Sequence, residues 1–322
     1  MIFKQTIRYL LLIIIINTIA SCTRKLYNSQ QPGPGKPASV TRPANSSGME
    51  GSIWYPSPNF GTIKTPPLVI LHHTATKLLD PSLRTLTSPK SQVSSHYLVT
   101  KDGIIYQLVD EQHRAWHAGI GSWNTIRDLN SSSIGIEIIN RGYEPFPQEQ
   151  IQALKVLLSD IKRRYRIPSR NFIGHLDVAP GRKTDPSHYF PWEELSKEGY
   201  GLWYDEGEVN NKTTYLPVFD PVWAFAILGY DTANIKLTIK AFKQHYLRQS
   251  PKSINTILDD KCYRILYSLV KKALSIPTVI TGPQNVEPLP DLDFNNENNN
   301  SSKDDNYPEL QKQATEYAPS SQ

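Results

Sequence analysis

Cysteine is scarce in this sequence. Only 2 of the 322 residues are cysteines, Cys22 and Cys262, which excludes the disulfide framework that stabilises many small exported domains. Positive charge is never concentrated either: the formal net charge is +5, but no run of five or more Lys or Arg residues occurs, so we expect no nucleic-acid partner. An anionic polymer or a membrane surface stays compatible with this mild excess. The sequence also lacks an internal repeat of solenoid length.

The N-terminal segment is typical of an export signal. Basic residues precede a continuous apolar run over residues 9–16, which is too short for a permanent membrane helix. The run leads to "IASC", which resembles the lipobox of bacterial lipoproteins, where the cysteine becomes the lipidated first residue. This resemblance implies a lipid anchor at Cys22, and Thr23 in place of Asp implies the outer membrane, facing the periplasm. The alternative is a plain signal peptide with an incidental cysteine.

Composition divides the chain into two globular units and two polar segments. With 39% hydrophobic residues and 25 prolines, the chain can bury one substantial core and a smaller one. We predict a signal peptide over 1–21, a flexible Ser/Pro/Gly/Asn-rich tether over 22–51, and a first domain over 52–206. A second domain follows over 207–282, and a disordered polar tail over 283–322.

The first domain is predicted to be α/β, with a central mixed sheet flanked by helices. Its pattern contains buried strands, a hairpin at Lys101-Asp102-Gly103, and an amphipathic helix in "PQEQIQALKVLLSDIKRRY". The strands are "PLVILHHT", "SSIGIEII" and "NFIGH". The second domain is predicted to be a small all-α unit of three helices, with Cys262 as a core residue.

Four polar residues accompany these strands. His72 ends the first strand, Glu137 lies within "IGIEI", His175 ends "NFIG", and Asp185 follows ten residues later. Two histidines and a carboxylate are the ligand set of a catalytic zinc ion with one open position. The helical His-Glu-x-x-His pattern of other zinc hydrolases is absent. Taken singly, each of these residues, and Lys183 in "GRKTD", is more often structural.

Several blocks of sequence together resemble a known family. "LHHTAT", "SHYLVTKDGIIYQLV", "RAWHAG", "SIGIEI" and "GHLDVAPGRKTDP" occur in the order seen in type 2 N-acetylmuramoyl-L-alanine amidases, which include phage-lysozyme-type amidases and the peptidoglycan recognition proteins. The resemblance covers roughly residues 53–203. Within the family, the chain is most similar to the outer-membrane lipoprotein amidases, which carry a C-terminal helical peptidoglycan-binding module.

The resemblance implies specific roles for residues in these blocks. It implies one Zn²⁺ per chain, held by His72, His175 and Asp185. It also implies that Glu137 and Lys183 are catalytic. One departure exists: phage-type members place a tyrosine before the histidine of the hairpin strand, whereas Ser95 precedes His96 here. We therefore expect Glu137 to carry the acid–base role alone.

Two further histidines are candidate substrate contacts. Successive strand residues point to opposite faces, so His72 and His73 are not expected to reach one metal. The family's His-x-Thr pattern selects His72, which leaves His73 as a rim residue or a substrate contact. His117 in "AWHAG" is a pocket residue by resemblance, with a hydrogen-bonded structural histidine as the alternative. The remaining histidines are expected to be structural or on the surface: His96, His113, His188 and His245.

The expected function is hydrolysis of the amide between N-acetylmuramic acid and the L-alanine of the stem peptide, in cell-wall turnover or remodelling. The partners are peptidoglycan or muropeptides, a membrane through the lipid anchor, and no second copy, since we expect a monomer. The alternatives are a non-catalytic peptidoglycan-binding lipoprotein or receptor and a structural tether. The C-terminal helices are expected either to bind the wall as an independently folding unit or to cap the amidase domain.

Overall fold

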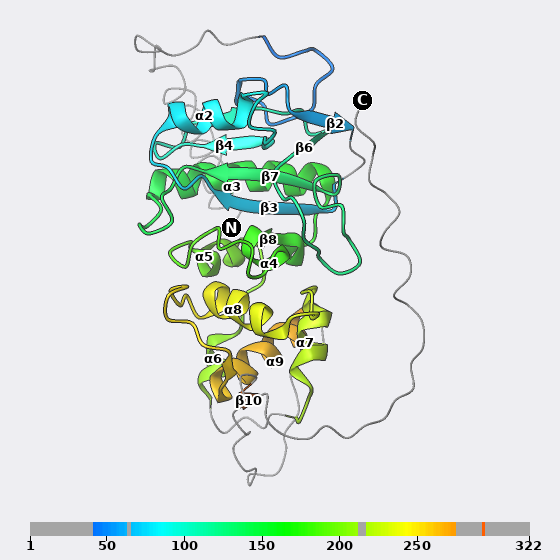
Figure 1. Cartoon of the computed structure of the whole chain (residues 1–322), viewed down its shortest axis with the longest axis vertical. Helices are drawn as coiled ribbons and strands as arrows, with labels where there is room; N and C mark the ends of the chain where they lie inside the picture. The colour runs from blue at the N-terminus through cyan, green and yellow to red at the C-terminus, as the bar shows by residue number, and fades with distance from the viewer. Residues whose placement is uncertain (1–40, 63–65, 212–216, 275–291, 294–322) are drawn as a thin grey trace, which may run out of the picture.

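A six-stranded mixed sheet forms the centre of the protein in the computed structural model, which describes residues 41–62, 66–211, 217–274 and 292–293 (Figure 1). The strand order is β1 (Ile53–Trp54), β5 (Ile105–Gln107), β4 (Tyr97–Val99), β7 (Ser133–Ile138), β3 (Leu68–His73) and β8 (Phe172–Gly174). Only β4 and β5 pair in antiparallel fashion; the other neighbours are parallel. The predicted α/β class with a mixed sheet is confirmed.

Two helices cover opposite faces of the sheet. On β4, Tyr97 and Val99 belong to the main core with the apolar residues of α3 (Gln148–Tyr165). Leu98, between them, packs instead with Leu83 and Leu86 of α2 (Leu79–Thr87). This division follows from the alternation of side chains along a strand.

The predicted strands and the long helix of this domain are present, and so is the hairpin at residues 101–103. There the Thr100 N–H donates to the Ile104 carbonyl at 2.9 Å. One expectation is wrong: His175 does not end a strand but begins the short helix α4 (His175–Val178). Helix α2 was not predicted from the sequence. Smaller elements complete this part: β2 (Phe60–Thr62) paired with β6 (His113–Ala115), η1 (Ser169–Asn171), α5 (Trp192–Lys197) and α6 (Glu206–Asn210).

Three C-terminal helices lie below β8 and α4 in Figure 1: α7 (Pro221–Leu228), α8 (Ile235–Tyr246) and α9 (Asp260–Leu274). The sequence sets the ends of α7, because the Asp220 side chain accepts the Val222 N–H, Pro221 follows it, and Gly229 adopts the left-handed conformation at the end. A two-stranded pair, β9 (Ile257–Leu258) with β10 (Leu292–Asp293), accompanies them.

The core of these helices is continuous with the core of the sheet domain. Phe242, Ile265 and Leu269 are fully buried and belong to the same cluster of packed residues as β3 and α3. Cys262 is buried as a free thiol, as predicted. The domain boundary at residues 206–207 stays a prediction, but the two predicted units share one apolar interior.

None of the helices within the described ranges is both long enough and apolar enough to cross a membrane. The predicted signal peptide over 1–21, Cys22 and most of the tether lie outside the described residues, as does nearly all of the tail over 283–322.

Candidate metal centre

The carboxyl ends of three parallel strands bring the predicted site residues together. His72 is next to last in β3 and pairs in register with Glu137 of β7, while His175 directly follows β8. Glu137 also pairs with Leu98, whose side chain packs against α2. Directly paired residues share a face of the sheet, so His72 and Glu137 point to the α2 side, which α3 does not cover. Ligand sites in sheets with parallel strands commonly lie at such strand ends.

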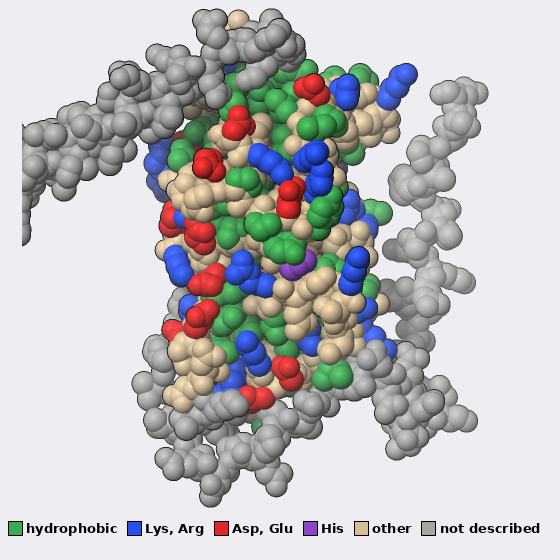
Figure 2. All heavy atoms as spheres, turned by 90° about the vertical axis from the view of Figure 1, so that its left-hand side faces the viewer, with side chains coloured by type: hydrophobic (Ala, Val, Ile, Leu, Met, Phe, Trp, Pro, Cys, Tyr) green, Lys and Arg blue, Asp and Glu red, His purple; other side chains and the backbone are tan. Residues whose placement is uncertain are grey.

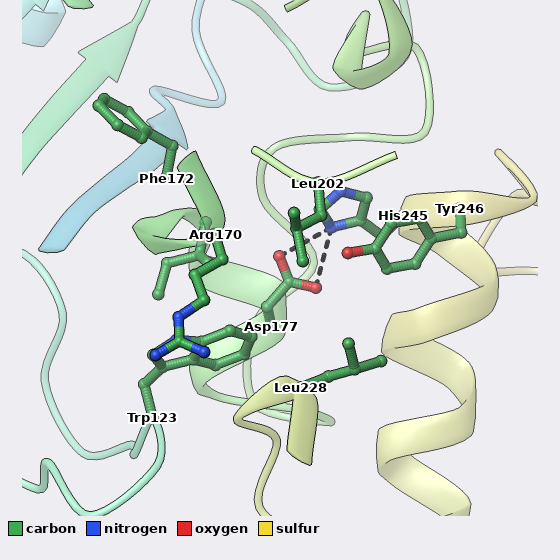
Figure 3. A pocket seen from close by; sticks show the side chains of 9 residues that line it. Trp123, Arg170, Phe172, Asp177, Leu202, Leu228, His245 and Tyr246 are labelled. Carbon is green, nitrogen blue, oxygen red and sulfur yellow. Dashed lines mark hydrogen bonds and ion pairs between the residues drawn. The ribbon is translucent and has the colours of Figure 1, made fainter. Parts of the chain in front are cut away.

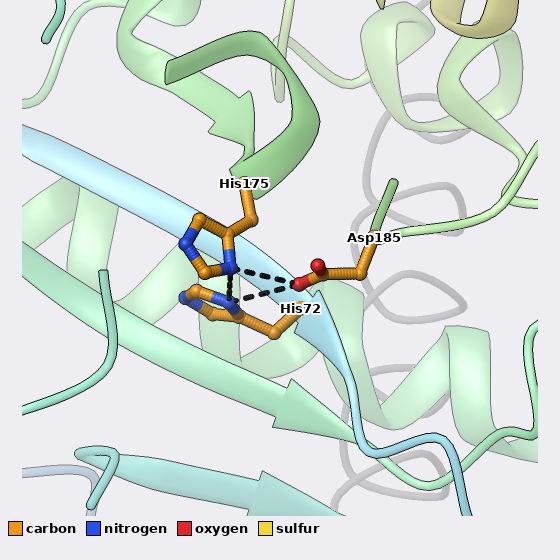
Figure 4. Close-up of side chains that lie close together, drawn as sticks. All are labelled: His72, His175 and Asp185. Carbon is orange, nitrogen blue, oxygen red and sulfur yellow. Dashed lines mark hydrogen bonds and ion pairs between the residues drawn. The ribbon is translucent and has the colours of Figure 1, made fainter. Parts of the chain in front are cut away.

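Three donor atoms converge at this edge (Figure 4). His72 Nδ1 lies 2.9 Å from His175 Nδ1. Asp185 Oδ2 lies 3.1 Å from His72 Nδ1 and 3.0 Å from His175 Nδ1. These three residues form the group of His, Cys, Asp or Glu side chains able to hold a metal ion within the described part of the chain. Zinc–ligand bonds of about 2.0–2.1 Å in a tetrahedron require ligand atoms roughly 3.3 Å apart. The donor set and its spacing therefore fit zinc.

The carbonyl of Ala118 fixes the tautomer of His175. His175 Nε2 lies 2.8 Å from the Ala118 oxygen. Because a carbonyl oxygen only accepts, Nε2 must carry the proton, and Nδ1 is left with a lone pair directed at His72 and Asp185. A second hydrogen bond of this kind is the usual device for orienting a metal-binding histidine.

A chain of hydrogen bonds fixes the tautomer of His72. The Ser133 hydroxyl donates to the Leu129 carbonyl at 2.5 Å and faces His117 Nε2 at 3.3 Å. Since the Ser133 proton is already used in that bond, His117 Nε2 carries a proton and donates it to Ser133 Oγ. His117 Nδ1 then carries no proton and accepts a hydrogen bond. His72 Nε2 lies 2.9 Å from His117 Nδ1 and supplies that proton. His72 Nδ1 is then also a lone-pair donor.

The charge state of these groups favours a bound cation. Burial and then the neighbouring His175 lower the pKa of His72, Asp185 raises it in part, and the resulting pKa is about 4. Burial alone would raise the pKa of Asp185, but the contacts with His175 and His72 outweigh it and hold that pKa well below its usual range. A neutral imidazole and a carboxylate thus present lone pairs to one point from which water is largely excluded, an arrangement that a metal ion stabilises.

Glu137 lies beside these three candidate ligands and is not part of their group. Burial, and then the Asp185 carboxylate, raise the pKa of Glu137 to about 8, while the positive charge of Lys183 lowers it. Its Oε2 atom is buried and has no hydrogen-bond partner among the described residues. A carboxylate with a pKa near neutral and a free oxygen is suited to accept and return a proton.

Lys183 lies in the turn between His175 and Asp185, the two candidate ligands that come later in the chain. Its N–H donates to the Ala179 carbonyl at 3.0 Å, which closes the turn that carries the side chain back toward the site. The ammonium makes no hydrogen bond or ion pair with any residue that the structure describes, yet its charge lowers the pKa of both His72 and Glu137. Lys183 therefore offers an uncommitted positive charge at the predicted site.

The two candidate substrate contacts differ in their surroundings. His117 uses both ring nitrogens in hydrogen bonds, one with Ser133 and one with His72. These contacts agree with the alternative of a hydrogen-bonded structural histidine. His73 pairs with Ile138 on the opposite face from His72, as the alternation predicts, and packs against the backbone of Gly142. A substrate role for either histidine stays a prediction.

Asp177 is a buried residue near the site for which no role was predicted from the sequence. It lies in the quoted block "GHLDVAPGRKTDP", two residues after His175, and its side chain is 1% exposed. A carboxylate that is this buried needs partners, and the block could have drawn attention to it.

The face in Figure 2 carries Lys/Arg and Asp/Glu side chains intermixed, with one histidine visible near its middle.

Comparison with known proteins gives concordant matches. A family model described as N-acetylmuramoyl-L-alanine amidase matches residues 63–188. The N-acetylmuramoyl-L-alanine amidase AmiD of Escherichia coli is 38% identical over 233 residues, which cover 64% of this chain and 82% of AmiD. The 1,6-anhydro-N-acetylmuramyl-L-alanine amidase AmpD of Haemophilus influenzae is 38% identical over 103 residues, or 32% of this chain and 56% of AmpD.

Solved structures of similar proteins share the fold. AmiD from E. coli, in a complex with the substrate anhydro-N-acetylmuramic acid-L-Ala-D-gamma-Glu-L-Lys, aligns with a TM-score of 0.58 at 37% identity and covers 66% of this chain and 91% of its own. AMPDH3 from Pseudomonas aeruginosa, in complex with an anhydromuramic pentapeptide, aligns with a TM-score of 0.57 at 31% identity and covers 72% of this chain and 98% of its own.

Proposed function

This chain belongs to the N-acetylmuramoyl-L-alanine amidase family, and we propose that it is a zinc-dependent peptidoglycan amidase of cell-wall turnover or remodelling. The bond it cleaves joins N-acetylmuramic acid to the L-alanine of the stem peptide. The observation that carries the zinc assignment is the convergence of His72 Nδ1, His175 Nδ1 and Asp185 Oδ2 beside the unpartnered carboxylate of Glu137. The muropeptides held by AmiD and AMPDH3 support a substrate of this class.

The residues of this chain divide the chemistry. When bound by His72, His175 and Asp185, zinc supplies a Lewis acid that polarises the scissile carbonyl and makes water acidic. Glu137 accepts the proton of the attacking water and passes it to the leaving amine, which departs poorly without it. The ammonium of Lys183 offsets the negative charge that develops on the carbonyl oxygen.

Two observations disfavour the non-catalytic alternatives. A peptidoglycan receptor or a tether needs a binding groove, but it gains nothing from a buried carboxylate whose pKa is raised to about 8. It also has no use for the ammonium of Lys183, which makes no ion pair with the described residues yet lies close enough to lower the pKa of Glu137. Both groups have a use in amide hydrolysis.

Product analysis tests the assigned bond. Incubation with an anhydro-muropeptide is expected to release an intact stem peptide with a free N-terminal alanine and the sugar as its lactyl acid, as identified by mass spectrometry. Cleavage inside the peptide, or between sugars, would assign the protein a different hydrolytic activity. Tight binding of the muropeptide without any product would favour the receptor.

We also propose that a lipid on Cys22 anchors the enzyme to the outer membrane, on the periplasmic side. The "IASC" sequence before a polar tether supports this proposal. Cys22→Ala is expected to remove the lipid and to move the protein from the membrane fraction to the soluble fraction, because the tether has little apolar surface of its own. Immunoblotting of fractionated cells measures this, and an unchanged membrane fraction would indicate another anchor.

A monomeric state also stays a prediction.

A further inference from the structure

One face of helix α8 contacts the segment that carries two of the metal ligands. Leu237, Gln244 and His245 have the spacing i, i+7 and i+8, which places them on one side of a helix. The backbone of Gly181 lies so close to Leu237 that an added Cβ would come within 2.6 Å of its side chain. The helix therefore packs along the chain between His175 and Asp185.

Gln244 holds the backbone on both sides of Asp185. Its Nε2 donates to the Thr184 carbonyl at 2.6 Å and to the Pro186 carbonyl at 3.3 Å. Because both partners are acceptors, the orientation of the amide follows from the hydrogen bonds themselves. Gln244 is 4% exposed, so water cannot easily replace these bonds. The amide thus restrains the peptide units that flank a metal ligand.

His245 holds the other ligand segment through Asp177. The Asp177 carboxylate accepts the Gly174 N–H at 2.8 Å, just before His175. The same carboxylate accepts hydrogen bonds from the Nδ1–H of His245 at 2.8 Å and from the Tyr230 hydroxyl at 2.7 Å. Figure 3 shows Asp177 and His245 joined across a small cavity between α4 and α8. Asp177 is thus hydrogen-bonded by one side chain of α8, His245, and by one from the segment that follows α7, Tyr230.

The two ligand segments are also joined to each other. The Leu176 N–H donates to the Asp185 carbonyl at 2.7 Å. A displacement of either segment is therefore transmitted to the other, and both have contacts with α8.

We infer that the C-terminal helices are part of the scaffold of the metal site, with Gln244 as a positioning residue for Asp185 and the His245–Asp177 pair as the support of the turn at His175. This inference rests on the proposed zinc site. Groups that hold metal ligands in place contribute to metal affinity because the ligands need not be ordered on binding. The helices then do more than cap the sheet or bind the wall: they tune the affinity for the metal.

The test uses the full-length protein and Zn²⁺ alone as the probe. Gln244→Met keeps the side-chain volume and removes both N–H donors, whereas Gln244→Ala leaves space for water at the two carbonyls. Ser268→Ala is the matched control. The buried Ser268 hydroxyl of α9 accepts the Asp205 N–H at 2.9 Å, so the variant loses a hydrogen bond across the same boundary, in a segment without metal ligands.

Competition with a chromophoric chelator measures the zinc dissociation constant. We expect it to rise roughly 10-fold or more in both Gln244 variants and to stay near the wild-type value in Ser268→Ala. With Co²⁺ as the probe, the visible absorption bands, which report ligand geometry, should change only in the Gln244 variants. Unchanged affinity in these variants, or an equal loss in Ser268→Ala, would overturn the inference while leaving the proposed function intact. Absence of zinc binding in the wild type would overturn both.

Discussion

His175→Ala is expected to abolish stoichiometric zinc binding and to lower turnover on the order of 10³-fold or more. The substitution removes one of three donor atoms that lie about 3 Å apart. It also leaves His72 Nδ1 and the Asp185 carboxylate without the geometry for a three-ligand site. Metal analysis of the purified variant, together with its kcat on a muropeptide, measures both effects.

His113→Ala is the matched control for this prediction. His113 is another histidine of the sheet domain, placed on β6 in ring contact with Phe60 and outside the group of candidate metal ligands. Its replacement should leave the zinc content near the wild-type level. Retention of zinc and activity by His175→Ala would exclude this residue from the metal site.

Glu137→Gln is expected to lower kcat by on the order of 100-fold or more while the zinc content stays unchanged. Glutamine has nearly the shape of glutamate, but it cannot take a proton from water and return it to the leaving amine. Because Glu137 is not among the converging donor atoms, its charge is dispensable for holding the metal. Steady-state kinetics and metal analysis of the same sample separate the two roles.

A surface carboxylate provides the control for Glu137. Glu144 pairs with Lys101 at 2.8 Å, and both side chains are about a third exposed, so Glu144→Gln should alter turnover little. Loss of zinc from Glu137→Gln would make Glu137 a structural support of the metal. Wild-type turnover in that variant would remove it from the mechanism.

The strand-borne part of the site was predictable from the sequence because strand ends leave clear signals. His72 and Glu137 follow runs of buried apolar residues, and parallel pairing of β3 with β7 then places them side by side. His175 was predicted to end a strand, but the strand ends at Gly174 and His175 begins α4. The reason is local: the side chain of Asp177, the third residue of the helix, accepts the N–H of Gly174 at the N-cap and so favours a helical turn.

The connections between the two predicted domains were not predictable in the same way. Gln244 acts on the backbone carbonyls of Thr184 and Pro186, and every residue has such a carbonyl, so no sequence pattern marks its partner. The Asp177–His245 pair joins residues 68 positions apart, and neither belongs to a spacing rule. Contacts of this kind depend on how two finished units pack.

The C-terminal helices share their core with the sheet domain. The sequence pattern changes from mixed strands and helices to helices at about residue 207, which suggested an independently folding helical unit. The apolar core is nevertheless continuous from β3 to α9. Wall binding by the helices remains a prediction, but the contacts of α8 with the ligand segments make it a structural partner of the catalytic domain as well.

We propose that catalysis depends on one zinc ion held by His72, His175 and Asp185. The most direct measurement is the turnover of an anhydro-muropeptide by chelator-treated protein as zinc is returned in known amounts. We expect negligible turnover without metal, a linear rise with added zinc, and a plateau at about one zinc per chain. Full turnover by the metal-free protein, or a plateau that requires a second zinc ion, would contradict it.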